Sequence, residues 1–334
     1  MSIVNWIKEP VELPDRFVLD ESEVEAIDTA LEESTIPIAD VPGLPPNRRR
    51  AFQGFLPGAK YDTDRPAAER LLALSEADYA EVVHPYLDGR DIARTIEQRP
   101  SRFVIDFGQM SLEAAMRYPA ALDVVREQAK HARETSASYH RNPQWWQFLW
   151  PRPGFRARLD GLDRFIAGTR VGKRILFAWC HPDWRPSDST NIFALDSDYA
   201  MGVLTSRIHT EWAAKKSSTL EDRIRYTPSS AFETFPWPQS DLGQRESIAR
   251  RAVELLALRS TLCREHEIGL TALYNAVDDG AFTALREAHR ALDLAVVSAY
   301  DWSSALLEDV RARNRALFER NAAILAGELE YSPF

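Results

Sequence analysis

A change of pattern near residue 240 constrains this chain of 334 residues more than any other feature. Before it, short apolar runs rich in β-branched and aromatic residues alternate with Pro and Gly, which is typical of strands separated by loops. After it, apolar residues recur every three or four positions, as on the buried face of a helix. The segment Phe235–Pro238 (Phe-Pro-Trp-Pro) separates the two parts, because two prolines so spaced end any regular element. We therefore predict an α+β fold: a mixed α/β domain over residues 1–240 and a small all-helical domain over 241–334.

The same patterns predict individual elements. Four prolines between Pro37 and Pro46 indicate an irregular connector. In the helical part, Leu285–Ala299 and Leu307–Ile324 carry helical spacing, and Gly269 and Asp278–Gly280 indicate helix ends. In the first part we expect strands at Ser2–Ile7, Phe103–Phe107, Arg174–Cys180 and Asn191–Leu195, and helices at Ser22–Glu33, Ala67–Leu74 and Ala120–Thr135.

Charge is distributed unevenly along the chain. The 41 Lys and Arg against 50 Asp and Glu give a formal charge of −9, which taken whole argues against a nucleic-acid-binding protein. Residues 1–100 and 191–334 carry −9 and −5, but residues 101–190 carry +5. An anion-binding surface is therefore expected in the middle of the chain.

The densest basic stretch, residues 126–174, holds eleven Lys and Arg against four acids, and nine of the eleven are Arg. Guanidinium groups bind phosphate bidentately and read guanine edges, whereas Lys acts mainly as a point charge. Spacings of four and three place Arg126, Lys130 and Arg133 on one side of a helix. The alternative interpretation is a solvated basic face whose interleaved aromatic residues belong to the core. The candidate DNA contacts here are Lys130, Arg133, Arg141, Gln144, Gln147, Arg152, Arg156, Arg158, Arg170, Lys173 and Arg174.

A second, smaller basic cluster precedes two glycines. Arg48, Arg49 and Arg50 come just before Gly54 and Gly58, so side chains and loop amides together could hold a phosphate. The alternative is an ordinary basic loop tip.

Other functional classes find little support in the sequence. Two cysteines without a CxxC motif predict a reducing, cytoplasmic setting, and no apolar stretch reaches the roughly 18 residues that span a bilayer. The seven histidines are dispersed, so we expect no metal site. No glycine-rich cofactor loop is found. The segment 142–145 (Asn-Pro-Gln-Trp) differs at Gln144 from the Asn-Pro-Pro-aromatic motif with which amino-methyltransferases grip a flipped adenine, and we interpret it as an ordinary turn.

Several strings occur in the order found in one protein family. Ser2–Lys8 resembles the edge strand that leaves the catalytic domain of large adenine-specific DNA methyltransferases. The Arg-Tyr-Thr-Pro string at Arg225–Pro228, followed by Phe232–Pro238, is the most specific block. On these residues the chain is identified as similar to the MmeI-like group of fused restriction-modification and phage-defence methyltransferases, although Asp301 stands where the family usually has Gly. Further matching strings are Phe52–Gly54, His84–Ile92, Phe103–Phe107, Trp145-Trp146, Phe193–Tyr199, Gly202–His209 with Trp212, and Leu292–Trp302.

The resemblance implies a target-recognition domain followed by the family's helical C-terminal segment. In the full enzymes the methyl-donor loop and the catalytic motif precede this region, so we expect neither in this chain, and we expect a split-gene partner or a truncated coding sequence. S-adenosylmethionine is then expected on a catalytic partner or a missing domain. The resemblance places Arg223 and Arg225 beside the DNA cleft, where contact and structural roles are equally compatible with the sequence. Phe232, Phe235 and Trp237 are interpreted as packing residues, and Arg207 and His209 as mainly structural.

The sequence therefore predicts the DNA target-recognition portion of a site-specific adenine-N6 methyltransferase system. Its expected partners are duplex DNA and a methyltransferase catalytic subunit or domain. Two alternatives stay open: a protein-interaction module that docks a partner through its acidic helical domain, and a chain that methylates alone through an unrecognised site. Whether the chain is itself an enzyme also stays open.

Overall fold

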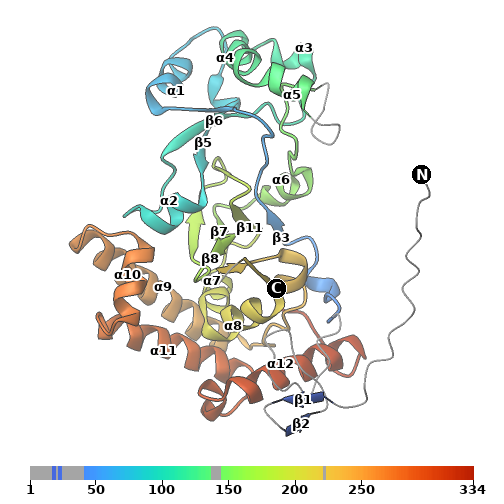
Figure 1. Cartoon of the computed structure of the whole chain (residues 1–334), viewed down its shortest axis with the longest axis vertical. Helices are drawn as coiled ribbons and strands as arrows, with labels where there is room; N and C mark the ends of the chain where they lie inside the picture. The colour runs from blue at the N-terminus through green and yellow to red at the C-terminus, as the bar shows by residue number, and fades with distance from the viewer. Residues whose placement is uncertain (1–16, 20–21, 25–40, 137–143, 221–222) are drawn as a thin grey trace. The chain divides into compact units, whose positions relative to one another are not determined.

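The computed structural model divides the chain into two compact units, Met1–Pro42 and Gly43–Phe334 (Figure 1). The described residues are 17–19, 22–24, 41–136, 144–220 and 223–334. In the first unit they form one antiparallel pair of strands, β1 (Phe17–Leu19) and β2 (Ser22–Val24). The helix predicted from Ser22 is thus wrong at its start, because Ser22–Val24 is extended and pairs with β1. The rest of that helix and the predicted strand at Ser2–Ile7 lie outside the described residues.

In the second unit, one four-stranded sheet has the order β10-β5-β6-β4. The strand β5 (Val83–Leu87) pairs antiparallel with β6 (Arg102–Ile105), and β4 (Asp62–Thr63) pairs antiparallel with the other side of β6. The short strand β10 (Arg185–Pro186) joins β5 in parallel. The strand predicted at 103–107 is confirmed as β6.

A second sheet has the order β3-β11-β7-β9 and is antiparallel throughout. Its two central strands, β7 (Phe165–Thr169) and β11 (Thr190–Phe193), are buried at every position. Of these two strands, the sequence analysis located β11 but did not identify β7. The edge strands are β3 (Ala51–Gln53) and β9 (Phe177–Cys180). The strands predicted over 174–180 and 191–195 are confirmed as β9 and β11.

A third, smaller sheet extends from the second one. It has the order β12-β13-β8 and contains β8 (Val171–Gly172), β12 (Ser218–Leu220) and β13 (Arg223–Arg225). The strand β8 follows β7 after the single residue Arg170, so the chain passes directly from one sheet to the next. This connection sets the position of Arg170 and of the basic residues after it.

The helix predicted over Ala120–Thr135 is confirmed, but it is not uniform. It consists of α4 (Pro119–Val125), a π-helical turn at Arg126–Lys130 and α5 (His131–Thr135). A π-helical turn holds more residues than an α-helical one and rotates the side chains that follow it. The predicted helix at Ala67–Leu74 is also confirmed as α1 (Arg65–Leu72). The other helices of this part are α2 (Gly89–Arg94), α3 (Leu112–Ala115), α6 (Pro153–Leu159), α7 (Asp198–Thr205) and α8 (Arg207–Lys216).

The C-terminal part consists of helices, as the spacing predicts. They are α9 (Leu242–Glu265), α10 (Leu270–Asp278), α11 (Thr283–Ala299) and α12 (Val310–Leu325). The helix α9 packs directly on α7, because a Cβ on Gly202 would lie 2.7 Å from Cγ2 of Ile248. The predicted α+β fold class is confirmed. The division at 240/241 stays a prediction, since Gly43–Phe334 cluster as one compact unit.

The Phe-Pro-Trp-Pro segment lies where the sheet and the helices meet. Phe232, Phe235 and Trp237 are fully buried, which confirms their interpretation as packing residues. The side chain of Asn321 on α12 donates to the backbone oxygen of Thr234 at 2.7 Å. This irregular segment therefore joins the helical part to the core by both apolar packing and hydrogen bonding.

Candidate nucleic-acid interface

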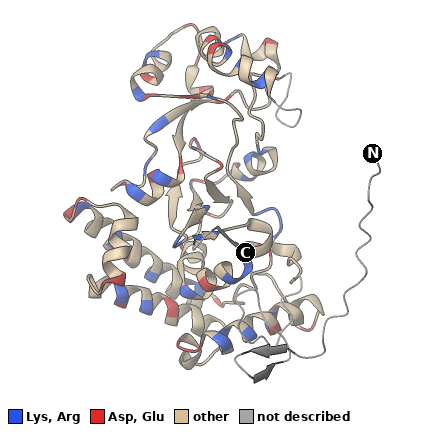
Figure 2. Cartoon of the chain, viewed as in Figure 1, with Lys and Arg blue, Asp and Glu red and all other residues tan. Residues whose placement is uncertain are grey.

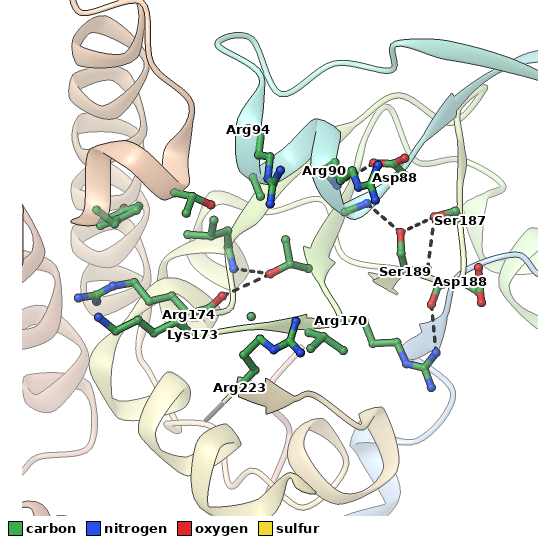
Figure 3. Close-up of a pocket in the computed structure, with 18 of the residues that line it drawn as sticks. Asp88, Arg90, Arg94, Arg170, Lys173, Arg174, Ser187, Asp188, Ser189 and Arg223 are labelled. Atoms are coloured by element: carbon green, nitrogen blue, oxygen red, sulfur yellow. Dashed lines mark hydrogen bonds between the residues drawn. The ribbon is translucent and has the colours of Figure 1, made fainter. Parts of the chain in front are cut away.

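A cleft of about 960 Å³ lies between α2, the turn from β7 to β8, β13 and α10 (Figure 3). Lys and Arg outnumber Asp and Glu on its walls by seven to three. An excess of positive charge in a concave surface attracts anions, even on a protein of negative overall charge. The basic lining residues are Arg90, Arg94, Arg102, Arg170, Lys173, Arg174 and Arg223, and the acidic ones are Asp62, Asp88 and Asp188.

One wall of the cleft is the turn after β7, which brings three predicted contacts together. Arg170 follows β7 directly, and Lys173 and Arg174 come just after β8. A Cβ on Gly172 would lie 2.8 Å from the backbone oxygen of Arg174, so the turn is too tight there for a side chain. As a result, Lys173 and Arg174 are exposed at the edge of the cleft.

The cations of this wall are held by few acceptors. Nζ of Lys173 lies 3.5 Å from Oδ2 of Asp278, and Arg174 pairs with the other oxygen of the same carboxylate. Nη1 of Arg170 donates to the backbone oxygen of Asp188 at 3.2 Å. One carboxylate against two exposed cations leaves a net positive charge that an anion can reach.

Like charges are crowded around Arg170. Burial, and then the positive charge of Arg225, lower the pKa of Arg170, while Asp188 acts in the opposite direction. Burial, and then Arg170, likewise lower the pKa of Arg152. Arginine stays protonated in proteins, so this repulsion persists and a bound anion would relieve it.

On another wall, Arg90 and Arg94 line the cleft from α2, whose arginines are blue in Figure 2, and the sequence analysis identified neither of them. They belong to the acidic first hundred residues, and His84–Ile92 served only as one string of the family resemblance. The signal that could have found them is the capping box of α2, in which Asp88 and Asp91 mark the helix start. On a helix that begins there, positions 90 and 94 share one face.

Other residues predicted to contact DNA form ion pairs and hydrogen bonds within the protein instead. Nη2 of Arg156 lies 2.5 Å and Nε of Arg185 lies 2.8 Å from Oδ2 of Asp106. Burial by itself raises the pKa of Asp106, but these two guanidinium groups outweigh it and the pKa is lowered. Nε of Arg152 donates to the backbone oxygen of Gly54 at 3.1 Å. Neither Arg152 nor Arg156 lines the cleft.

Arg133 and Gln147 are buried, and this corrects their placement on a DNA-facing surface. Nη1 of Arg133 donates to the backbone oxygen of Pro57 at 2.9 Å, and Nε2 of Gln147 donates to that of Met110 at 2.8 Å. The π-helical turn rotates Arg133 inward, so it does not share an exposed side with Arg126 and Lys130. A side chain without exposed surface cannot reach a phosphate.

The Arg48–Arg50 cluster does not line the cleft either. Arg48 and Arg49 are exposed, while the Arg50 guanidinium lies 4.1 Å from the centre of the Phe334 ring. The amide of Gly54, expected to help hold a phosphate, donates to the backbone oxygen of Thr190 at 2.9 Å. The loop-amide part of that prediction is therefore wrong at Gly54.

The remaining predicted contacts are scattered. Arg158 on α6, Gln144 and Arg225 on β13 are exposed and do not line the cleft, Lys130 is half-buried, and Arg223 on β13 does line it. Arg141 lies outside the described residues, as do positions 142 and 143 of the near-motif.

The part of the chain that the structure describes holds no group of three or more His, Cys, Asp or Glu side chains arranged to bind a metal ion. Among the same residues, no helix is both long and apolar enough to cross a membrane.

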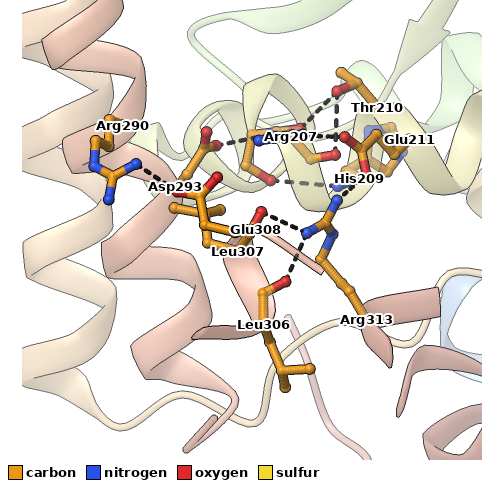
Figure 4. A network of polar contacts seen from close by, with 11 residues as sticks. Arg207, His209, Thr210, Glu211, Arg290, Asp293, Leu306, Leu307, Glu308 and Arg313 are labelled. Carbon is orange, nitrogen blue, oxygen red and sulfur yellow. Dashed lines mark hydrogen bonds and ion pairs between the residues drawn. The ribbon is translucent and has the colours of Figure 1, made fainter. Parts of the chain in front are cut away.

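A polar network fixes α8 against α11 and α12 (Figure 4). Oδ1 of Asp293 on α11 accepts from the backbone N of Arg207 at 2.7 Å, and Nε of Arg207 lies 2.6 Å from Glu211. Arg313 of α12 pairs with the same Glu211 and is fully buried. His209 is buried as well, with Nδ1 2.9 Å from the backbone oxygen of Leu204. These contacts support the structural interpretation of Arg207 and His209.

Fold and cleft together define an α+β protein with a wide, predominantly basic cleft. Residues 175–239 match the family model for the MmeI target recognition domain. This segment, which contains β9, β11, β13 and the Phe-Pro-Trp-Pro block, is similar to the MmeI target recognition domain.

Two known proteins extend this comparison. The chain is 31% identical to DNA methyltransferase A of Bacillus subtilis (strain 168) over 102 residues, which are 30% of this chain and 11% of that protein. The fold is similar to the solved structure of the type IIL restriction-modification enzyme MmeI in complex with DNA, with a TM-score of 0.70 and 19% identity. That match covers 91% of this chain and 39% of the MmeI chain. The chain thus spans a minor part of each of these proteins.

Proposed function

We propose that this chain is the DNA target-recognition part of a site-specific adenine-N6 methyltransferase or restriction-modification system, and that duplex DNA binds along the basic cleft. The observation that carries the proposal is the convergence of seven Lys and Arg from α2, β6, the β7–β8 turn and β13 on one concave surface, in a chain of charge −9. The similarity of residues 175–239 to the MmeI target recognition domain supports the same conclusion.

The basic side chains of the cleft differ in how exposed they are and in how closely acidic side chains pair with them. Lys173 and Arg174 are exposed and share one carboxylate, so they can exchange Asp278 for a DNA phosphate. Arg170, between β7 and β8, and Arg223, on β13, complete the positive surface. Arg102 contributes little, because Asp62 and Asp88 lie 2.6 and 2.9 Å from its guanidinium group and neutralise it.

Fluorescence anisotropy with a labelled duplex of about 30 base pairs at low salt tests this function. The unmodified chain is expected to bind with a dissociation constant in the micromolar range or below. The double variant K173Q/R174Q removes two positive charges from the cleft. It is expected to weaken binding to all sequences and to reduce the slope of log K against log salt by about two.

The matched control is K60Q/R70Q, which removes the same charge from exposed positions outside the cleft. The control should retain most of the affinity. Binding that falls equally in both double variants would reflect general attraction and would contradict the cleft. No binding by the unmodified chain at micromolar concentration would favour the protein-interaction alternative.

The proposal also includes a catalytic partner. We infer that S-adenosylmethionine binds to a methyltransferase subunit or domain outside this chain, since the match to DNA methyltransferase A covers only 11% of that protein. Calorimetry of the isolated chain with S-adenosylmethionine is expected to give no binding heat. Micromolar affinity would instead support a chain that methylates alone.

A further inference from the structure

The short helix α2 is held rigidly at both ends. Its first residue, Gly89, donates its backbone N–H to Oγ of Ser189 at 2.8 Å, and a Cβ there would lie 3.0 Å from the backbone oxygen of Ser189. At its last residue, a Cβ on Gly269 would lie 2.4 Å from the backbone C and O of Arg94. The helix is therefore wedged between the 187–189 loop and the start of α10.

The N-terminal turn of α2 is fixed from within as well. Oδ1 of Asp88 accepts from the backbone N of Arg90 at 2.7 Å, and Oδ2 of Asp91 accepts from the backbone N of Asp88 at 2.9 Å. Such a capping box satisfies donors that a helix start otherwise leaves open. Side chains on a helix so fixed start from well-defined backbone positions.

The two arginines of α2 differ in their pairing from those on the turn after β7. The side chains of Arg90 and Arg94 are exposed, line the cleft, and make no hydrogen bond or ion pair with the described residues. Arg170 and Arg174, on the turn after β7, both have a partner within the protein. A pair at i and i+4 is separated by about 6 Å along the helix axis, close to two base-pair steps of duplex DNA.

We propose that α2 is a reading helix, whose Arg90 and Arg94 donate to base edges while Lys173 and Arg174 hold the DNA backbone. This inference rests on the proposed function. A guanidinium fork matches the O6 and N7 acceptors of guanine, and a reading residue is most selective when its backbone is rigid. The unpaired arginines and the wedged backbone of α2 provide both features.

Selection from a randomised duplex library, followed by sequencing, tests the proposal on the full chain. The variants R90K and R94K keep the charge but lose the bidentate fork, so a phosphate contact would largely survive and a base contact would not. Each variant is expected to lose preference for guanine at one position, by roughly 5- to 150-fold, with little change in affinity for unselected duplex. The matched control is R70K, an exposed arginine on α1 that does not line the cleft.

The possible outcomes distinguish the reading role of α2 from the proposed function itself. If the unmodified chain enriches a sequence and both variants enrich it with the same preference, α2 does not read bases, and the proposed function stands without it. If both variants also lose affinity for all sequences equally, the arginines hold phosphates and the reading role is likewise overturned. If the unmodified chain enriches no sequence, the proposed function itself fails.

Discussion

Two arginine-rich regions of this protein differ in what their charges do. Residues 126–158 belong to the densest basic stretch of the sequence, yet Arg133, Arg152 and Arg156 bind acceptors inside the protein. On the cleft walls, Arg90, Arg94 and the residues after β7 face a cavity, although α2 lies in the acidic part of the chain. Charge density along a sequence thus does not locate a binding surface; burial and pairing in the folded protein do.

The largest change in stability is expected where two arginines pair with a buried carboxylate. In D106N, Arg156 and Arg185 lose the buried carboxylate that pairs with both. The free energy of unfolding, measured with urea, is expected to fall by about 3–5 kcal/mol, because removing one partner leaves buried charge uncompensated. D123N, which breaks an exposed ion pair with Arg126, is the control and should change it by less than about 1 kcal/mol. Equal losses in the two variants would contradict the distinction between interior and surface arginines.

A half-buried histidine near the cleft, His289, predicts a pH effect. Burial, and then Arg259 and Arg174, lower the pKa of His289 to about 4, and its Nε2 lies 2.9 Å from the hydroxyl of Tyr274. The unfolded chain, with an ordinary histidine pKa near 6.5, takes up this proton first as the pH falls. Stability is therefore lost between about pH 6.5 and 4, at up to about 1.4 kcal/mol per pH unit for this group.

The variant H289Q isolates that contribution. Between pH 6 and 4.5, its free energy of unfolding should fall with pH less steeply than that of the unmodified protein, by about one proton. His84 and His209, whose pKa values are also lowered to about 4 mainly by burial, keep their own share in both proteins. H181Q is the control, because His181 is exposed. An unchanged slope in H289Q would show that His289 is not held neutral.

The close approach of α10 to α2 predicts a smaller effect. In G269A the new methyl group would lie 2.4 Å from the backbone of Arg94, so one of the two helices must move. We expect a loss of about 1–3 kcal/mol in the free energy of unfolding, as for other overpacked sites. The control G243A places a methyl group 3.5 Å from the nearest contact, Oδ1 of Asp241, and should be near neutral. An unchanged free energy of unfolding in G269A would contradict the rigid packing of α2 against the start of α10.

The smallest expected effect concerns Asp278, the shared acceptor of Lys173 and Arg174. D278N frees both cations, so affinity for random duplex should rise by about two- to fivefold, in line with the value of an exposed ion pair. Anisotropy titrations at two salt concentrations measure the change. D279N removes the neighbouring acid, which does not line the cleft, and should bind like the unmodified chain. Unchanged affinity in D278N would mean that Asp278 does not compete with DNA.

Much of the fold could be predicted, because local patterns reflect local structure. The central strand β11 and the helices α4 and α11 follow from apolar runs and helical spacing alone. The helix predicted at Ser22–Glu33 failed at its start, since Ser22–Val24 pairs with β1, and pairing with another strand overrides local preference. Of the candidate contacts, the sequence identified Arg170, Lys173, Arg174 and Arg223 on the cleft wall, but not Arg90 or Arg94.

The sequence by itself determined the α+β class, the helical C-terminal part and the resemblance to a target-recognition family, since each depends on residues close together in the chain. Only the tertiary structure decided which arginines are available to a ligand. Arg133 meets Pro57 from 76 positions away, and Arg174 meets Asp278 from 104 positions away. Whether a charge is buried, paired or free depends on such distant partners, and no pattern along the chain records them.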